Sequence, residues 1–227
     1  GEGLSGTGPK AGGPHYLRRV RRGEVATGNV EQGAGESVPQ RFADAARDTW
    51  STRSDRIAIL RKHLRGKASA AIAAAAATDF GPVDLPGPTG EANTLTLMPR
   101  GRALCLGPDG ESLLAQVVQA LAAGNSVVAI APGAPIVLHP LLGKGLPLLG
   151  VDGTLYTWEL GAVGVDVVAY SRRGETARAI RRALADRTGP IVPLIAEIIY
   201  PAAYAHERSV CVDTTAAGGN ASLLAAS

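Results

Sequence analysis

RALCLGPDGESLLAQVVQALAAGNSVVAIA (Arg102 to Ala131) is the stretch of sequence that decides the fold. RALCL (102–106) alternates like a strand, ESLLAQVVQALAAG (111–124) has the apolar spacing of an amphipathic helix, and SVVAIA (126–131) is an apolar run typical of a buried strand. Gly124 favours a left-handed end to the helix. A strand, a helix and a strand joined by short links predict a right-handed crossover between parallel strands.

The same alternation continues toward the C-terminus. GVDVVAY (164–170), GETARAIRRALADRTG (174–189) and IVPLI (191–195) repeat the order of strand, helix and strand, again with a glycine closing the helical pattern. Apolar strands of this kind lie in parallel sheets with helices on both faces. The sequence therefore predicts an α/β fold, with a small Rossmann-like parallel sheet domain over residues 95–207.

Helical patterns also precede this domain. One extends from Gln40 to about Arg65, with Ser54 and Asp55 placed to cap a second helix, and ASAAIAAAAATDF (68–80) has a strong intrinsic helix preference. GPVDLPGPTGE (81–91) is extended or turned, because its prolines forbid a helix. We therefore expect a linker and helical arm over residues 23–94. The tail begins as an alternating strand, RSVCVD (208–213).

Charge is distributed unevenly along the 227 residues. Residues 1–67 hold 13 Lys and Arg against 7 Asp and Glu, whereas the remainder holds 10 against 13. The basic patch of Arg18, Arg19, Arg21 and Arg22 is interpreted as a solvated or carboxylate-paired face, and we expect no nucleic acid contact from it. The aromatic content of 4% also disfavours a stacking platform for single-stranded nucleic acid. No apolar run is long enough to predict a transmembrane helix.

The residues at the first strand–helix turn argue against a nucleotide site. GPDGE (107–111) is not the G-x-G-x-x-G fingerprint, and Asp109 and Glu111 stand at the helix N-terminus, where they would repel a phosphate. Gly6 to Ala11 fits a looser form of the fingerprint but follows no strand. We therefore predict no cofactor site in this chain.

Residues that could support catalysis or bind a metal show no suitable pattern. The four histidines lack metal-ligand spacing, and no nucleophile motif is present, so we predict neither a metal site nor a catalytic residue. Cys105 and Cys211 are expected to be reduced and buried as small apolar side chains. Glu197 is expected at the carboxyl end of the sheet, at its edge.

Three separated stretches resemble proline utilization A (PutA), a family of bifunctional bacterial flavoenzymes. SGTGPKAGGPHYL (5–17) resembles the end of its glutamate semialdehyde dehydrogenase module, and LPGPTGEANTLTLMPRGRALCL (85–106) resembles the entry to the extra aldehyde-dehydrogenase-superfamily domain of the long members. DTTAAGGNASLLA (213–225) resembles their C-terminal motif. The resemblance assigns residues 1–22 to the dehydrogenase module and 208–227 to a C-terminal flap, and it implies a C-terminal fragment of such a protein.

This resemblance implies a parent enzyme that oxidises proline to glutamate with FAD and NAD. It implies that neither cofactor binds to this chain and that the chain alone is inactive. The expected role is that of a lid, scaffold and oligomerisation module that helps to seal the passage of the intermediate. The implied partners are the upstream catalytic domains of the same polypeptide and further copies of it. The implied location is the cytoplasm, with peripheral contact to the inner membrane as an alternative.

The resemblance also assigns roles to individual residues. Gly12 and Gly13 are expected to offer main-chain N–H groups to the substrate carboxylate; the alternative is a plain turn. Leu223 and Leu224 close the flap or, alternatively, meet lipid. Two other functions stay open, a free-standing α/β module that binds an anion or a protein and a membrane-surface attachment domain. The expected flap residues are Thr214, Thr215, Ala216, Ala217, Gly218, Gly219, Asn220, Ala221, Ser222, Leu223 and Leu224.

Overall fold

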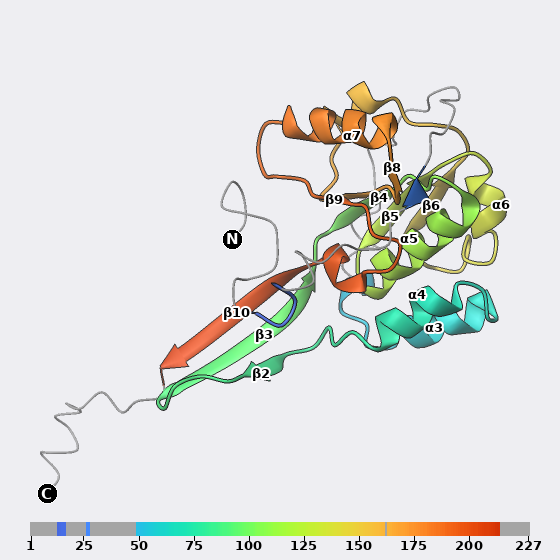
Figure 1. Ribbon diagram of the computed structural model, residues 1–227. Helices are drawn as coiled ribbons and strands as arrows, with labels where there is room; N and C mark the ends of the chain where they lie inside the picture. The colour runs from blue at the N-terminus through green and yellow to red at the C-terminus, as the bar shows by residue number, and fades with distance from the viewer. Residues whose placement is uncertain (1–12, 17–25, 28–48, 162, 214–227) are drawn as a thin grey trace, which may run out of the picture.

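A five-stranded parallel sheet forms the centre of the structure, a computed structural model that describes residues 13–16, 26–27, 49–161 and 163–213 (Figure 1). Its strand order is β6-β5-β4-β7-β9, and every neighbouring pair is parallel. The chain enters this sheet at the central strand β4, adds β5 and β6 toward one edge, and then returns to add β7 and β9 toward the other edge. This is the predicted α/β, Rossmann-like arrangement. Its strands are β4 (Arg102–Cys105), β5 (Ser126–Ile130), β6 (Leu148–Val151), β7 (Val167–Ala169) and β9 (Leu194–Ile195).

Helices cover both faces of the sheet because its central strands are apolar on both sides. Ala103 and Cys105 of β4 pack into the cluster that contains α5 (Gly110–Ala122), whereas Leu104 packs into the cluster that contains α7 (Glu175–Ala185). The short helix α6 (Ala134–Leu138) contacts α5, and the 3₁₀ helix η1 (Thr157–Gly161) contacts α7. The sheet therefore separates two apolar cores.

The helices predicted as an arm pack directly on the main core. Leu60 and Leu64 of α3 (Arg56–Leu64) are buried, as is Ile72 of α4 (Ser69–Ala76). Both helices contact α5, and the alanines of α4 leave room for a close approach. Trp50 extends this contact, since its indole N–H donates to the Leu121 carbonyl at 2.8 Å. Helices α3 and α4 thus share one apolar cluster with the sheet.

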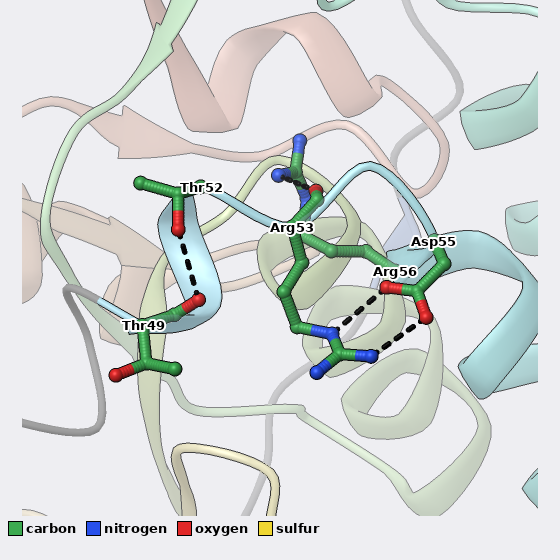
Figure 2. A network of polar contacts seen from close by, with 5 residues as sticks. All are labelled: Thr49, Thr52, Arg53, Asp55 and Arg56. Carbon is green, nitrogen blue, oxygen red and sulfur yellow. Dashed lines mark hydrogen bonds and ion pairs between the residues drawn. The ribbon is translucent and has the colours of Figure 1, made fainter.

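The turn that leads into α3 is held by arginines (Figure 2). Arg53 donates two hydrogen bonds to the Asp55 carboxylate, at 2.8 and 2.6 Å, so this carboxylate does not cap α3 as the sequence predicts. Arg56 links the start of α3 to the end of α5 and to the preceding turn, because its guanidinium donates to the Ala122 carbonyl at 2.9 Å and to the Ser51 carbonyl at 2.8 Å. Its positive charge lies at the C-terminal end of α5, where the helix dipole favours it.

Three antiparallel strands form a second sheet, which we call the ribbon. Its order is β10-β3-β2, from β2 (Val83–Leu85), β3 (Glu91–Pro99) and β10 (Ala205–Asp213). β3 and β10 pair along nine residues, from Pro99 with Ala205 to Glu91 with Asp213. Figure 1 shows the ribbon projecting away from the parallel sheet. β10 is accordingly buried at Ala205 and exposed from Arg208 onward.

Cys211 differs from its predicted state. It is exposed, because it lies on the part of β10 that extends beyond the apolar core, and alternation along a strand cannot reveal whether a second layer covers it. Val210 and Val212 are 41% and 53% exposed for the same reason. Prolines 82, 86 and 88 flank β2 and the turn after it, which agrees with the predicted extended stretch.

Two element boundaries also differ from the predictions. α7 ends at Ala185, four residues before Gly189, which shapes the following loop with φ +93° rather than closing the helix. β9 covers only 194–195 of the predicted 191–195. By contrast, Gly124 has φ +91° directly after α5, where a left-handed stop was predicted. Among the described residues, none of the helices combines the length and apolarity needed to cross a bilayer.

Candidate functional site

The carboxyl ends of the parallel strands form the natural ligand edge of this fold. The chain leaves central β4 toward β5 on one side and later returns to β7 on the other. In open α/β sheets, ligands bind at the carboxyl edge near this reversal, and the first strand–helix turn carries the phosphate of a nucleotide. A nucleotide site in this fold would therefore lie at the turn between β4 and α5.

This turn is filled by the protein's own side chains. Gln116 of α5 is fully buried; its amide donates to the Gly107 carbonyl at 2.6 Å and accepts from the Gly107 N–H at 3.1 Å. The same amide group donates to the Ser171 hydroxyl at 2.9 Å, beyond the end of β7. Gly107 adopts φ +82°, a conformation that favours glycine. Its N–H, which a phosphate loop would offer outward, is already bonded inside the molecule.

The N-terminus of α5 carries a carboxylate where a phosphate would bind. Asp109 accepts a hydrogen bond from the Ser112 N–H at 2.8 Å, and Glu111 lies in the first turn of the helix. Arg172 approaches Asp109 at 3.5 Å and partly balances its charge. A Cβ on Gly110 would come within 2.9 Å of a Val137 methyl group, so the turn is tightly packed. These residues do not fit the pyrophosphate of NAD.

A pocket opens beside this turn, on the face of the sheet that α7 covers. It contains about 550 Å³ of space, part of it open to solvent. The carboxyl ends of β4, β5 and β7, the loop after β6 and the first turns of α7 form its walls. Its lining residues are Leu106, Pro108, Ile130, Ala131, Pro132, Gly153, Thr154, Leu155, Thr157, Leu160, Tyr170, Thr176 and Ile180.

The site residues predicted by resemblance fall largely outside this region. Gly12, the basic patch at 18–22 and the flap residues 214–224 lie outside the described residues. Gly13 is described, and its carbonyl accepts a hydrogen bond from the Tyr16 N–H at 3.1 Å in a short turn. The substrate and flap roles therefore stay predictions.

The remaining candidates suit structural roles. Cys105 is fully buried, and burial raises the pKa of its thiol well above the usual range, which disfavours the nucleophilic thiolate. Glu197 lies just beyond β9, the edge strand, at the carboxyl end as expected. Within the described ranges, His, Cys, Asp and Glu side chains nowhere gather in threes that could hold a metal ion.

Sequence reasoning missed both Gln116 and the pocket. A glutamine inside an apolar helical pattern was the available signal for Gln116, because a buried amide must find hydrogen-bond partners. Gln119 shows the same pattern; its amide donates to the Ile198 carbonyl at 2.8 Å. The pocket had no local signal, since its walls come from segments far apart in sequence.

Comparison with known proteins connects this geometry to a family. Although no protein-family profile matches the chain, 99% of it aligns with "Bifunctional protein PutA" of Escherichia coli K12 at 35% identity. The PutA of Rhizobium meliloti aligns over the same share at 36% identity. The chain is related to PutA. It spans 17–18% of the length of these two relatives.

Solved PutA structures agree with this relation. A bifunctional proline utilization A protein matches with a TM-score of 0.52 and 27% identity over 74% of the chain and 22% of its own length. A PutA variant from Bradyrhizobium japonicum matches at 0.50 and 28%, over 67% of the chain and 21% of its own length. A Bacillus subtilis protein described as an aldehyde dehydrogenase, 18% identical with a TM-score of 0.53 over 68% of the chain and 45% of its own, shares the fold. The PutA resemblance expected from three short stretches is confirmed.

Proposed function

We propose that this chain is a non-catalytic lid and scaffold module of a PutA-type enzyme that oxidises proline to glutamate. The observation that carries the proposal is the β4–α5 turn: in a chain related to PutA, Gln116 accepts a hydrogen bond from the Gly107 N–H, and Asp109 places a carboxylate at the helix N-terminus that would repel a phosphate. A Rossmann-like domain without a phosphate site has no obvious means of holding NAD. We infer that such a domain acts through its surface, by contacting other domains.

In this proposal the redox steps belong to other parts of the parent polypeptide. A flavin-dependent dehydrogenase makes pyrroline-5-carboxylate, which hydrolyses to glutamate semialdehyde, and an NAD-dependent dehydrogenase oxidises the aldehyde. FAD and NAD are assigned to those domains, which act in the cytoplasm and are the partners of this chain. Gly12 and Gly13 are proposed to line the substrate carboxylate site of the second dehydrogenase.

The ribbon supplies the covering surface in this proposal. It projects beyond the apolar cores, and its outer strands β10 and β2 each have one edge without a strand neighbour among the described residues. Val210 and Val212 lie on one face of exposed β10, and residues 214–224 follow it directly. An exposed strand edge with apolar side chains can pair with another domain or a second copy. We infer that the ribbon and the following flap close the passage used by the intermediate.

A leakage assay on the full-length parent tests this role. The test variants are deletion of 214–227 and the double substitution Val210→Asp with Val212→Asp; Ile191→Asp, at an exposed site outside the ribbon, is the matched control. With proline as the sole substrate, both test variants should lengthen the lag before NADH forms several-fold. They should also release pyrroline-5-carboxylate that o-aminobenzaldehyde traps.

The two half-reactions serve as internal controls. Each one, measured with its own substrate, should stay within about twofold of the unaltered parent in all variants. Size-exclusion chromatography would report any loss of oligomerisation by the ribbon variant. An unchanged lag and no trapped intermediate in both test variants would overturn the lid role.

A further inference from the structure

The pocket on the α7 face has a chemical character that the lid role does not use. Its lining contains no charged side chain. Four hydroxyl groups, from Thr154, Thr157, Tyr170 and Thr176, are set among aliphatic and proline side chains. Small-molecule sites have this composition, with mostly apolar walls and a few polar groups that fix orientation.

The base of the pocket is firmly built. Ile130 at the end of β5, Leu160 of η1 and Ile180 of α7 are at most 2% exposed and belong to one apolar cluster. Arg187 donates to the Leu160 carbonyl and so fastens η1 to the end of α7. Tyr170 is buried, and it lines the pocket together with Thr176 in the first turn of α7. The space is therefore preformed between rigid elements.

The surroundings of the pocket select against charge. Pro108 lines it, and the next residue, Asp109, holds a carboxylate at the start of α5 whose charge Arg172 partly balances at 3.5 Å. Transferring a charged group into apolar walls without a counter-charge is costly. A ring compound with hydrogen-bonding groups on its rim matches aliphatic walls and scattered hydroxyls better than a phosphorylated ligand does.

We propose that this pocket binds a small uncharged compound with an apolar body and hydrogen-bonding groups at its rim. The binding site is independent of the ribbon, because none of its lining residues belongs to β2, β3 or β10. Failure of this proposal would leave the lid role intact, and the reverse also holds.

Ligand-observed NMR on the full 227-residue chain tests the proposal with two matched pairs of probes. Indole and adenosine are the neutral members, and indole-3-carboxylate and AMP are their anionic counterparts. We expect the neutral probes to bind with dissociation constants in the millimolar range or below, and the anionic ones at least tenfold more weakly. Absence of binding by both neutral probes, or equal binding of AMP and adenosine, would overturn the proposal.

Substitutions locate the binding. Thr154→Phe fills the half-buried rim and should weaken both neutral probes at least tenfold, whereas Thr188→Phe, at an exposed site just beyond α7, should leave them unchanged. Thr176→Val keeps the side-chain volume, removes a hydroxyl and should weaken adenosine several-fold. Circular dichroism checks that each variant is folded. Undiminished binding by both folded pocket variants would place the probes elsewhere and reject the assignment.

Discussion

Three buried amide side chains determine much of the local geometry. Gln116 holds the β4–α5 turn, Gln119 holds the segment after β9, and Asn125 accepts from the Gly101 N–H at 2.9 Å while donating to the Tyr204 carbonyl at 2.9 Å. All three are fully buried. Buried amides of this kind stabilise a fold because leaving their backbone partners unbonded costs about 1–3 kcal/mol each.

Cys105 should make stability depend on pH in the alkaline range. Burial raises the pKa of its thiol, whereas the unfolded chain ionises it near about 8.5. Its contribution is therefore complete below about pH 8.5 and is lost as pH rises, by about 1.4 kcal/mol per pH unit. Urea unfolding under reducing conditions between pH 8.5 and 9.5 should show a loss about 1 kcal/mol larger for the unaltered chain than for Cys105→Ala.

The second cysteine provides the comparison for this experiment. Cys211 is exposed, so Cys211→Ala should keep most of the pH dependence seen in the unaltered chain. A thiol reagent should likewise modify Cys211 in the folded protein and Cys105 only after unfolding. Parallel pH profiles for the unaltered chain and Cys105→Ala would contradict the prediction.

At the scale of elements, helix α5 depends on its N-terminal cap. Asp109 is the only cap of a described α-helix whose side chain accepts a bond from that helix. Replacing Asp109 by Ala removes this bond and should lower the free energy of unfolding by about 1 kcal/mol, whereas Asp109→Asn keeps a capping oxygen and should cost a few tenths. Urea unfolding of the two variants measures the difference. Equal stability of Asp109→Ala and the unaltered chain would refute the capping role.

Elements with strong local signals could be predicted from the sequence. α5, β4 and β5 follow the expected ranges closely because their apolar patterns are clear and each lies next to Gly107 or Gly124 in the sequence. The sequence could not predict the end of α7, the length of β9 or the exposure of Cys211, because these features depend on which neighbouring segments cover them. The pocket lay beyond sequence reasoning because five separate segments form it.

At the scale of the whole molecule, α3 and α4 should unfold together with the sheet. The chain has two tryptophans, of which Trp50 is buried in the α5 cluster and Trp158 is 74% exposed. In Trp158→Phe, the emission of Trp50 should shift red at the same urea concentration at which helical circular dichroism is lost. Leu60→Ala in that background should lower the free energy of unfolding by about 2–5 kcal/mol and should move both transitions together to a lower urea concentration.

A detachable helical arm predicts a different outcome. Trp50 would then become exposed at a lower urea concentration than the loss of the remaining helices, and Leu60→Ala would move only the earlier transition. Trp50→Phe, which keeps the exposed Trp158, controls for signal that arises outside the core. Two separated transitions would show that α3 and α4 are independent of the sheet.

The pairing of β3 with β10 has a consequence for the order of folding. Residues 100–204, which include the whole five-stranded sheet, lie between the two strands that pair at Pro99 and Ala205. The ribbon therefore closes a loop that contains the whole parallel sheet but not α3 and α4, and the entropic cost of that closure falls sharply once the sheet has brought its ends together. The chain enters and leaves the parallel sheet at one point, so the ribbon can fray strand by strand while the sheet stays intact.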